Sequence, residues 1–211
     1  MKKTLYSLML DDNVMRLADL QAHRLGLTRS AYVNQVLANA VGYVTPAERI
    51  NSIFAAAEAL LAPDQELVPF FTPNTGLMSM KSSLSYKYRP TVKYEVALSA
   101  EAGDTLGTLN VIFRTQSAEL ISLLTAFFRL WKGIEDRCFP GRFGYALYDG
   151  RLERSLRLPE TDVTAEEIAE AITDYVSLFD HCMKAYLAGQ MDEADVDGAY
   201  RAAIQAAKVK I

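Results

Sequence analysis

Near its start the chain has a short stretch of alternating side chains, and this pattern predicts one β-strand over residues 3–10. One face of the strand holds Thr4, Tyr6, Leu8 and Leu10, and the other holds Lys3, Leu5, Ser7 and Met9. The next forty residues follow helical patterns and offer the strand no partner. Because a lone strand leaves its backbone groups unpaired, the simplest partner is the same strand of a second copy, in a two-stranded antiparallel ribbon.

Two capped helices are predicted after this strand. Asp11 and Asp12 offer an N-cap to the segment 14–25, whose apolar side chains recur at helical spacing, and Gly26 ends it. Thr28 caps the second helix, which ends at Gly42. The apolar stripe of the second helix consists of Val33, Val36, Leu37, Ala40 and Val41.

The segment LYSLMLDDNVMRLADLQAHRLGLTRSAYVNQVL, residues 5–37, resembles the ribbon-helix-helix family of bacterial and plasmid repressors, which includes the Arc and MetJ types. The closest match is GLTRSAYV at residues 26–33, and the resemblance covers about a fifth of the chain. It implies an intertwined dimer whose ribbon lies in the major groove of DNA. In such a dimer Tyr6, Leu8 and Leu10 would form the shared core.

The same resemblance assigns the DNA contacts. Lys3, Leu5, Ser7 and Met9 would face the base edges, while Thr28, Arg29 and Ser30 at the start of the second helix would contact a phosphate. The strand departs from the family pattern because base edges are read by Arg, Lys, Asn or Gln, whereas Leu5 and Met9 are apolar. Two interpretations follow. Either the ribbon reads its site weakly, through Ser7 and thymine methyl groups, or it mainly dimerises.

The rest of the chain predicts an α+β domain. A capping box at Thr45–Glu48 opens a helix that ends before Pro63, and residues 64–76, with two prolines and a glycine, are interpreted as a linker. Three strands over 78–88, 91–98 and 108–115 each have one apolar and one polar face, which is typical of an antiparallel meander. A helix over 117–134 is apolar nearly all round and should be buried on several sides.

A hairpin and two helices complete the pattern. Asp149-Gly150 suits a type I′ turn between two strands, a second capping box at Thr164–Glu167 opens a helix to Leu187, and a short helix is expected over 200–211. Without the short last helix, the predicted order from residue 45 is α-β-β-β-α-β-β-α. The predicted domains are a ribbon-helix-helix module at 1–44, a helix and linker at 45–76, and an α+β domain at 77–211.

The net charge of −4 excludes a basic field over the whole chain of 211 residues. Residues 1–45 have five Lys or Arg against three Asp, a net charge of +2, which leaves −6 for the remainder. The N-terminal residues do not form a signal-peptide pattern, and no apolar run is long enough for a membrane span. We therefore expect a cytoplasmic protein whose Cys138 and Cys182 stay reduced.

No catalytic pattern is evident, so we expect neither an enzyme nor a cofactor or metal. Asp180, His181 and Cys182 are neighbours, but adjacent helical residues point about 100° apart and cannot converge. The glycines match no phosphate-binding loop. The side chains of Met78, Met80, Tyr86 and Tyr88 could line a pocket, although the core face of a sheet is the simpler interpretation.

The element order from Thr45 is also similar to the small α/β modules of type III secretion chaperones, which bind protein segments. The leading hypothesis is a dimeric DNA-binding transcriptional regulator whose C-terminal domain binds an effector or partner, or adds oligomer contacts. The alternative is a protein-binding adaptor or chaperone-like module in which the ribbon only dimerises. An antitoxin ranks third, because the C-terminal part is long and patterned.

Overall fold

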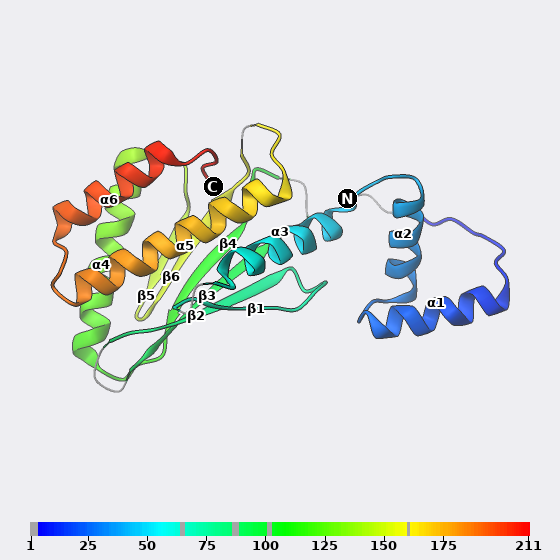
Figure 1. Cartoon of the computed structure of the whole chain (residues 1–211), viewed down its shortest axis with the longest axis horizontal. Helices are drawn as coiled ribbons and strands as arrows, with labels where there is room; N and C mark the ends of the chain where they lie inside the picture. Colours follow the sequence, from blue (N-terminus) through cyan, green and yellow to red (C-terminus); the bar gives the residue numbers. More distant parts are fainter. Residues whose placement is uncertain (1–3, 64–65, 86–88, 101–102, 160) are drawn as a thin grey trace.

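The computed structural model describes residues 4–63, 66–85, 89–100, 103–159 and 161–211. It places two helices, α1 (Asp12–Arg24) and α2 (Arg29–Ala40), in a small head that projects from one end of a larger body (Figure 1). Asp11 caps α1 by accepting hydrogen bonds from the backbone N–H groups of Asn13 and Val14. Gly26 and Gly42, both with φ near +65° to +70°, follow the two helices, as the sequence predicted.

The body contains four further helices among the described residues. These are α3 (Pro46–Leu61), α4 (Ala118–Cys138), α5 (Ala165–Leu187) and α6 (Glu193–Ala206). The capping boxes predicted at Thr45 and Thr164 are both formed, with reciprocal hydrogen bonds to Glu48 and Glu167. The last helix was predicted only over 200–211. It begins earlier because Asp192 caps it, and residues 207–211 leave it as an extended segment.

The described strands form one six-stranded antiparallel sheet in the order β1-β2-β3-β4-β6-β5. Their bounds are β1 (Val68–Phe71), β2 (Leu77–Ser83), β3 (Thr91–Leu98), β4 (Thr105–Phe113), β5 (Tyr145–Tyr148) and β6 (Arg151–Arg157). The antiparallel α+β class predicted from the sequence is therefore confirmed. Gly107 lies at an irregularity between β4 and its neighbours, where a Cβ atom would stand 2.0 Å from the carbonyl oxygen of Ala97.

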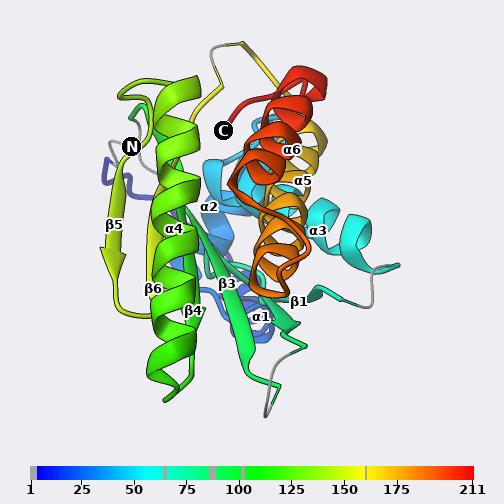
Figure 2. The ribbon, with the colours of Figure 1, turned by 90° about the vertical axis from the view of Figure 1, so that its left-hand side faces the viewer.

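Helices cover one face of the sheet. Figure 2 shows α4 beside α5, with α6 lying along both. The core between helices and sheet is rich in aromatic rings, with Phe127, Trp131 and Phe179 in mutual contact at its centre. Met78 and Met80 belong to this core, so the simpler interpretation of these two methionines is confirmed, whereas Tyr86 and Tyr88 lie outside the described residues.

The opposite face of the sheet is polar and carries no helix from the described part of the chain. On this face Lys93 forms an ion pair with Glu95, both on β3. Arg151 of β6 donates to Asn110 of β4 and forms an ion pair with Glu153 of β6. This face is the polar side of the alternation that the sequence shows. None of the described helices is long and apolar enough to cross a membrane.

Two local predictions are wrong. Residues 68–71, interpreted as linker, form the edge strand β1, where Pro69 is tolerated because one side of an edge strand needs no donor. The turn at Asp149-Gly150 is not type I′, because only Gly150 has a positive φ, whereas that turn needs positive φ at both residues. The two-residue connection between β5 and β6 is nevertheless present.

The boundary predicted at residue 77 falls inside the sheet. Strand β1 pairs with β2 along its whole length, and Ile53, Phe54 and Ala57 of α3 are buried in the body's core. Residues 45–63 and 66–76 are therefore structurally part of the body.

Candidate functional sites

The N-terminal segment forms no strand in the single chain. Residues 4–10 have neither helical nor strand structure and are all exposed, while Lys3 lies outside the described residues. Leu5 and Met9 are fully exposed, and on the other side of the segment Tyr6 is 80% and Leu8 64% exposed. A strand needs a hydrogen-bonding partner, and the single chain offers none here. In the single chain, Tyr6, Leu8 and Leu10 are therefore not buried, in contrast to the burial expected for the dimer.

The apolar side chains of helices α1 and α2 are also largely unpacked against other parts of the chain. Ala22 and Ala38 are their only buried residues, and most of the large apolar side chains of both helices are exposed. These exposed side chains are Val14, Leu17, Leu20, Val36 and Leu37. Two helices of this length gain most of their stability from packing an apolar face, so the head as it stands is an incomplete core.

The residues assigned to phosphate contact lie together at the exposed beginning of α2. Thr28 caps the helix by accepting a hydrogen bond from Ala31 N at 3.3 Å, and Ser30 follows in the first turn. The Arg29 guanidinium donates to both carboxylate oxygens of Asp19 on α1, each over 2.5 Å. Hydrogen bonding from Arg29 lowers the pKa of the Asp19 carboxyl, and the same pair raises the pKa of Arg29.

A few polar contacts connect the head to the body. Asn74, in the turn between β1 and β2, donates from its side chain to the carbonyl oxygen of Leu25 over 3.2 Å. Asn74 is itself held by Asn51 of α3. Backbone hydrogen bonding from Thr45 lowers the pKa of Glu48, and the side chains of Gln35 and Asn39 on α2 add to this effect.

The body contains a buried ion pair that sequence reasoning missed. Glu135 of α4 accepts hydrogen bonds from Arg154 of β6 and from the hydroxyl groups of three tyrosines. These are Tyr145, Tyr175 at 3.2 Å and Tyr200 at 2.9 Å. The sequence did contain a signal, because Arg154 alternates with Leu152 and Leu156 on the apolar face of its strand, where an arginine needs a buried partner.

Arg154 is also enclosed by aromatic rings. Its guanidinium carbon lies 3.8 Å from the ring centre of Phe143 and 4.3 Å from that of Tyr175. Burial by itself would lower the pKa of Arg154, but Tyr175 and Glu135 outweigh it and hold this pKa above its ordinary value. Burial raises the pKa of Tyr175 as well, so both groups keep their protons at neutral pH.

A second buried carboxylate, Asp180 of α5, accepts hydrogen bonds from Tyr94 at 2.8 Å and Ser82 at 3.0 Å, and pairs with Lys184 at 2.7 Å. Its neighbour His181 is exposed, and Cys182 is buried with its pKa raised to about 11 by that burial. The three neighbours therefore point to different surroundings, as helical geometry predicts. Asp180 thus connects α5 to strands β2 and β3 of the sheet through hydrogen bonds.

The chain was compared with known proteins at three levels. No protein-family model matches it, no curated protein matches it, and no solved structure matches it.

Proposed function

We propose that the chain is a dimeric DNA-binding transcriptional regulator of the ribbon-helix-helix type, with an α+β body that binds an effector or partner or adds oligomer contacts. The observation that supports this most is the uncovered apolar surface of the head. Residues 4–10 have the alternating pattern of a strand but no regular structure in the single chain, and α1 and α2 also expose apolar side chains. A second head would supply both the missing strand and the missing half of the core.

The geometry at the start of α2 supports the proposed phosphate contact. Free backbone N–H groups and the helix dipole favour an anion at this end, and Arg29 and Ser30 are exposed beside it. Arg29 is paired with Asp19, but the two side chains are 60% and 41% exposed to water, where ion pairs are weak. A DNA phosphate can therefore replace Asp19 as the partner of Arg29.

The second candidate is an adaptor in which the ribbon only dimerises. It is favoured by the apolar outward face of the segment, where Leu5 and Met9 stand fully exposed and offer no hydrogen bond to a base edge. Ser7 is then the central polar side chain of that face. The two candidates differ in one measurable property, which is binding to DNA.

The deciding experiment is fluorescence anisotropy with labelled genomic fragments at several salt concentrations. With Lys2, Lys3 and Arg29 acting twice in a dimer, about six cationic contacts should give a slope of about −5 in log K against log salt. Arg29→Ala should weaken binding to all sequences alike and flatten the slope, because phosphate contacts are independent of sequence. Ser7→Ala should change preference among sites and leave the slope alone.

Two matched variants sharpen the test. Arg16→Ala removes another exposed arginine of the head, on α1 and outside the proposed contact, and should leave the slope unchanged. Asp19→Ala frees Arg29 and removes a negative charge, so it should strengthen binding to every fragment. If the intact dimer binds no fragment at about 50 mM salt, where phosphate contacts are strong, the regulator is excluded and the adaptor remains.

A further inference from the structure

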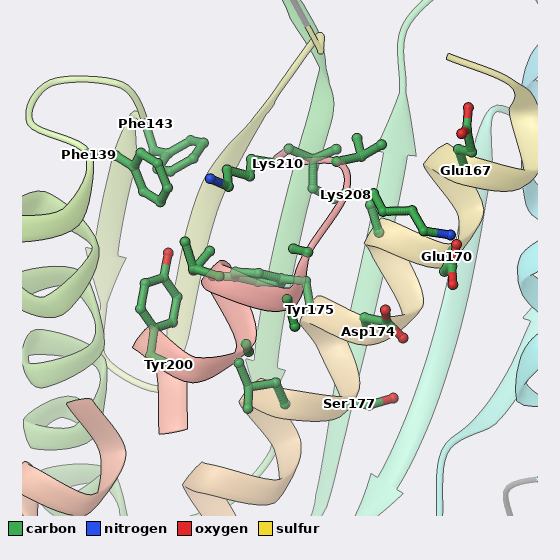
Figure 3. A pocket seen from close by; sticks show the side chains of 18 of the residues that line it. Phe139, Phe143, Glu167, Glu170, Asp174, Tyr175, Ser177, Tyr200, Lys208 and Lys210 are labelled. Atoms are coloured by element: carbon green, nitrogen blue, oxygen red, sulfur yellow. The ribbon is translucent and has the colours of Figure 1, made fainter. Parts of the chain in front are cut away.

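The body contains a cavity of about 370 Å³ between α5, α6 and the extended residues 207–211, here named the strap. This volume falls in the range of pockets that hold small organic molecules. Aromatic rings of Phe139, Phe143, Tyr175 and Tyr200 line one end, and aliphatic side chains line much of the rest (Figure 3). The cavity lies in the body, so a ligand there does not depend on DNA binding by the head.

Two arginines hold consecutive main-chain oxygens of the strap. Arg142 donates to the oxygen of Lys210 over 3.1 Å, and Arg154 donates to the oxygen of Ile211 over 2.8 Å. Both guanidinium groups lie over the ring of Phe143. Planar guanidinium groups stacked on an aromatic ring form a strong binding site for a carboxylate.

The strap itself shows what this end of the cavity accepts. The Ile211 side chain is only 4% exposed and belongs to the hydrophobic core cluster, while its main-chain oxygen meets the buried Arg154. A branched aliphatic group beside an oxygen acceptor therefore fits this position. Residues 207–211 have no regular secondary structure, so few backbone hydrogen bonds oppose their release.

The charges around the cavity are divided between its two ends. Glu167, Glu170 and Asp174 project from α5 at one end, whereas Lys210 lies with Phe139 and Phe143 at the other (Figure 3). Lys208 extends from the strap toward the acidic end. At the other end three cations, Arg142, Arg154 and Lys210, stand against one carboxylate, Glu135, which pairs with Arg154. An anionic group is therefore favoured at this end rather than beside the three carboxylates of α5.

We propose that this cavity binds a small monocarboxylate with a branched aliphatic or aromatic body. The carboxylate accepts a hydrogen bond from Arg154 in place of the Ile211 main-chain oxygen, and the body fills both the position left by the Ile211 side chain and the adjoining part of the cavity. The strap is then a competitor attached to the same chain, and such segments act at effective concentrations in the mM range. Ligand binding and release of the strap are consequently coupled.

The probe is N-acetylisoleucine, and its amide, N-acetylisoleucinamide, is the matched control without the charge. Binding is followed by isothermal titration calorimetry on the full chain and by the fluorescence of Trp131, the single tryptophan. Trp131 reports on the site because its Nε1 donates to the Tyr175 hydroxyl over 2.8 Å, and Tyr175 stacks on Arg154. The carboxylate should bind saturably, and about tenfold more tightly than the amide.

Three variants place the ligand in this cavity. Ala203→Phe fills the cavity from α6 and should abolish binding, whereas Ala202→Phe, exposed on the same helix and outside the lining, should leave it unchanged. Ile211→Ala weakens the competing strap and should tighten binding of N-acetylisoleucine about tenfold. A gain of affinity is a result that a folding defect does not produce.

Saturable binding of the acid, with loss in Ala203→Phe and gain in Ile211→Ala, supports the proposal. Equal binding of acid and amide would overturn the carboxylate assignment. Unchanged binding in Ala203→Phe would place the ligand elsewhere. The absence of any heat or fluorescence change in the folded wild type and in Ile211→Ala would exclude the site altogether. None of these outcomes depends on the DNA-binding measurement.

Discussion

Arg154 of β6 donates from Nε and Nη2 to the two carboxylate oxygens of Glu135 of α4, each over 3.0 Å, and both side chains are buried. This pair connects the hairpin β5–β6 to α4 through one bidentate contact. Its charges are matched, and the described residues contain no buried side-chain polar atom without a hydrogen-bond partner. A buried pair is costly to break even where its net contribution to stability is small.

Glu135→Gln should lower the free energy of unfolding by about 3–5 kcal/mol, because Arg154 then stays buried as an unpaired cation. Urea denaturation followed by Trp131 fluorescence measures this. Glu153→Gln, on the opposite face of β6, is the control and should change stability by less than about 0.5 kcal/mol. The double variant Glu135→Gln with Arg154→Met removes the cation and keeps an amide oxygen as acceptor for the tyrosine hydroxyl groups, so it should be more stable than Glu135→Gln alone. If the double variant loses as much free energy of unfolding as the two single substitutions added together, the unpaired-charge explanation is contradicted.

Leu8→Asp should abolish dimerisation of the head, since the proposed ribbon dimer would bury its carboxylate without a partner. In the single chain Leu8 is exposed, so the substitution should not unfold the body. Sedimentation at several concentrations reports the change. Leu5→Asp places the same charge on the outward face of the segment and should leave the dimer intact. A wild-type protein that sediments as a folded monomer at micromolar concentration argues against the ribbon.

A fragment of residues 45–211 should fold by itself, whereas one of residues 77–211 should be strongly destabilised. The shorter fragment lacks α3, whose Phe54 is completely buried, and also lacks β1, which covers the edge of β2. Circular dichroism and urea denaturation of both fragments provide the comparison. Equal stability of the two would mean that α3 and β1 contribute nothing to the core, contrary to their burial.

Asp174→Asn should stabilise the protein at pH values above the raised pKa of the Asp174 carboxyl, and have little effect below the ordinary pKa of an aspartate, about 3.9. Burial, and then the nearby charge of Glu170, raise the pKa of Asp174 in the folded state. The folded protein therefore binds this proton more tightly than the unfolded chain, and stability falls as pH rises through the raised pKa. Thermal denaturation of both proteins between pH 3.5 and 7 tests the direction, and an unchanged difference across that range would refute it.

Local signals in the sequence determined most of the elements. The capping boxes at Thr45 and Thr164 fixed the starts of two helices, because their hydrogen bonds form within four residues. Alternation identified β3 at its observed bounds and separated the buried face of the sheet from the polar one. The same reasoning explains why adjacent Asp180, His181 and Cys182 do not form a cluster.

Only the tertiary structure decided which distant residues meet. Glu135 and Arg154 are 19 positions apart and join a helix to a strand, and Ile211 reaches Arg154 across 57 positions. No local period encodes such pairs, because they depend on which faces of separate elements pack together. Strand β1 shows the same limit, since a short segment with Pro69 becomes a strand only when β2 offers it an edge. Residues 4–10 show the converse, because an alternating pattern stays without strand structure where the described part of the head offers no neighbouring strand.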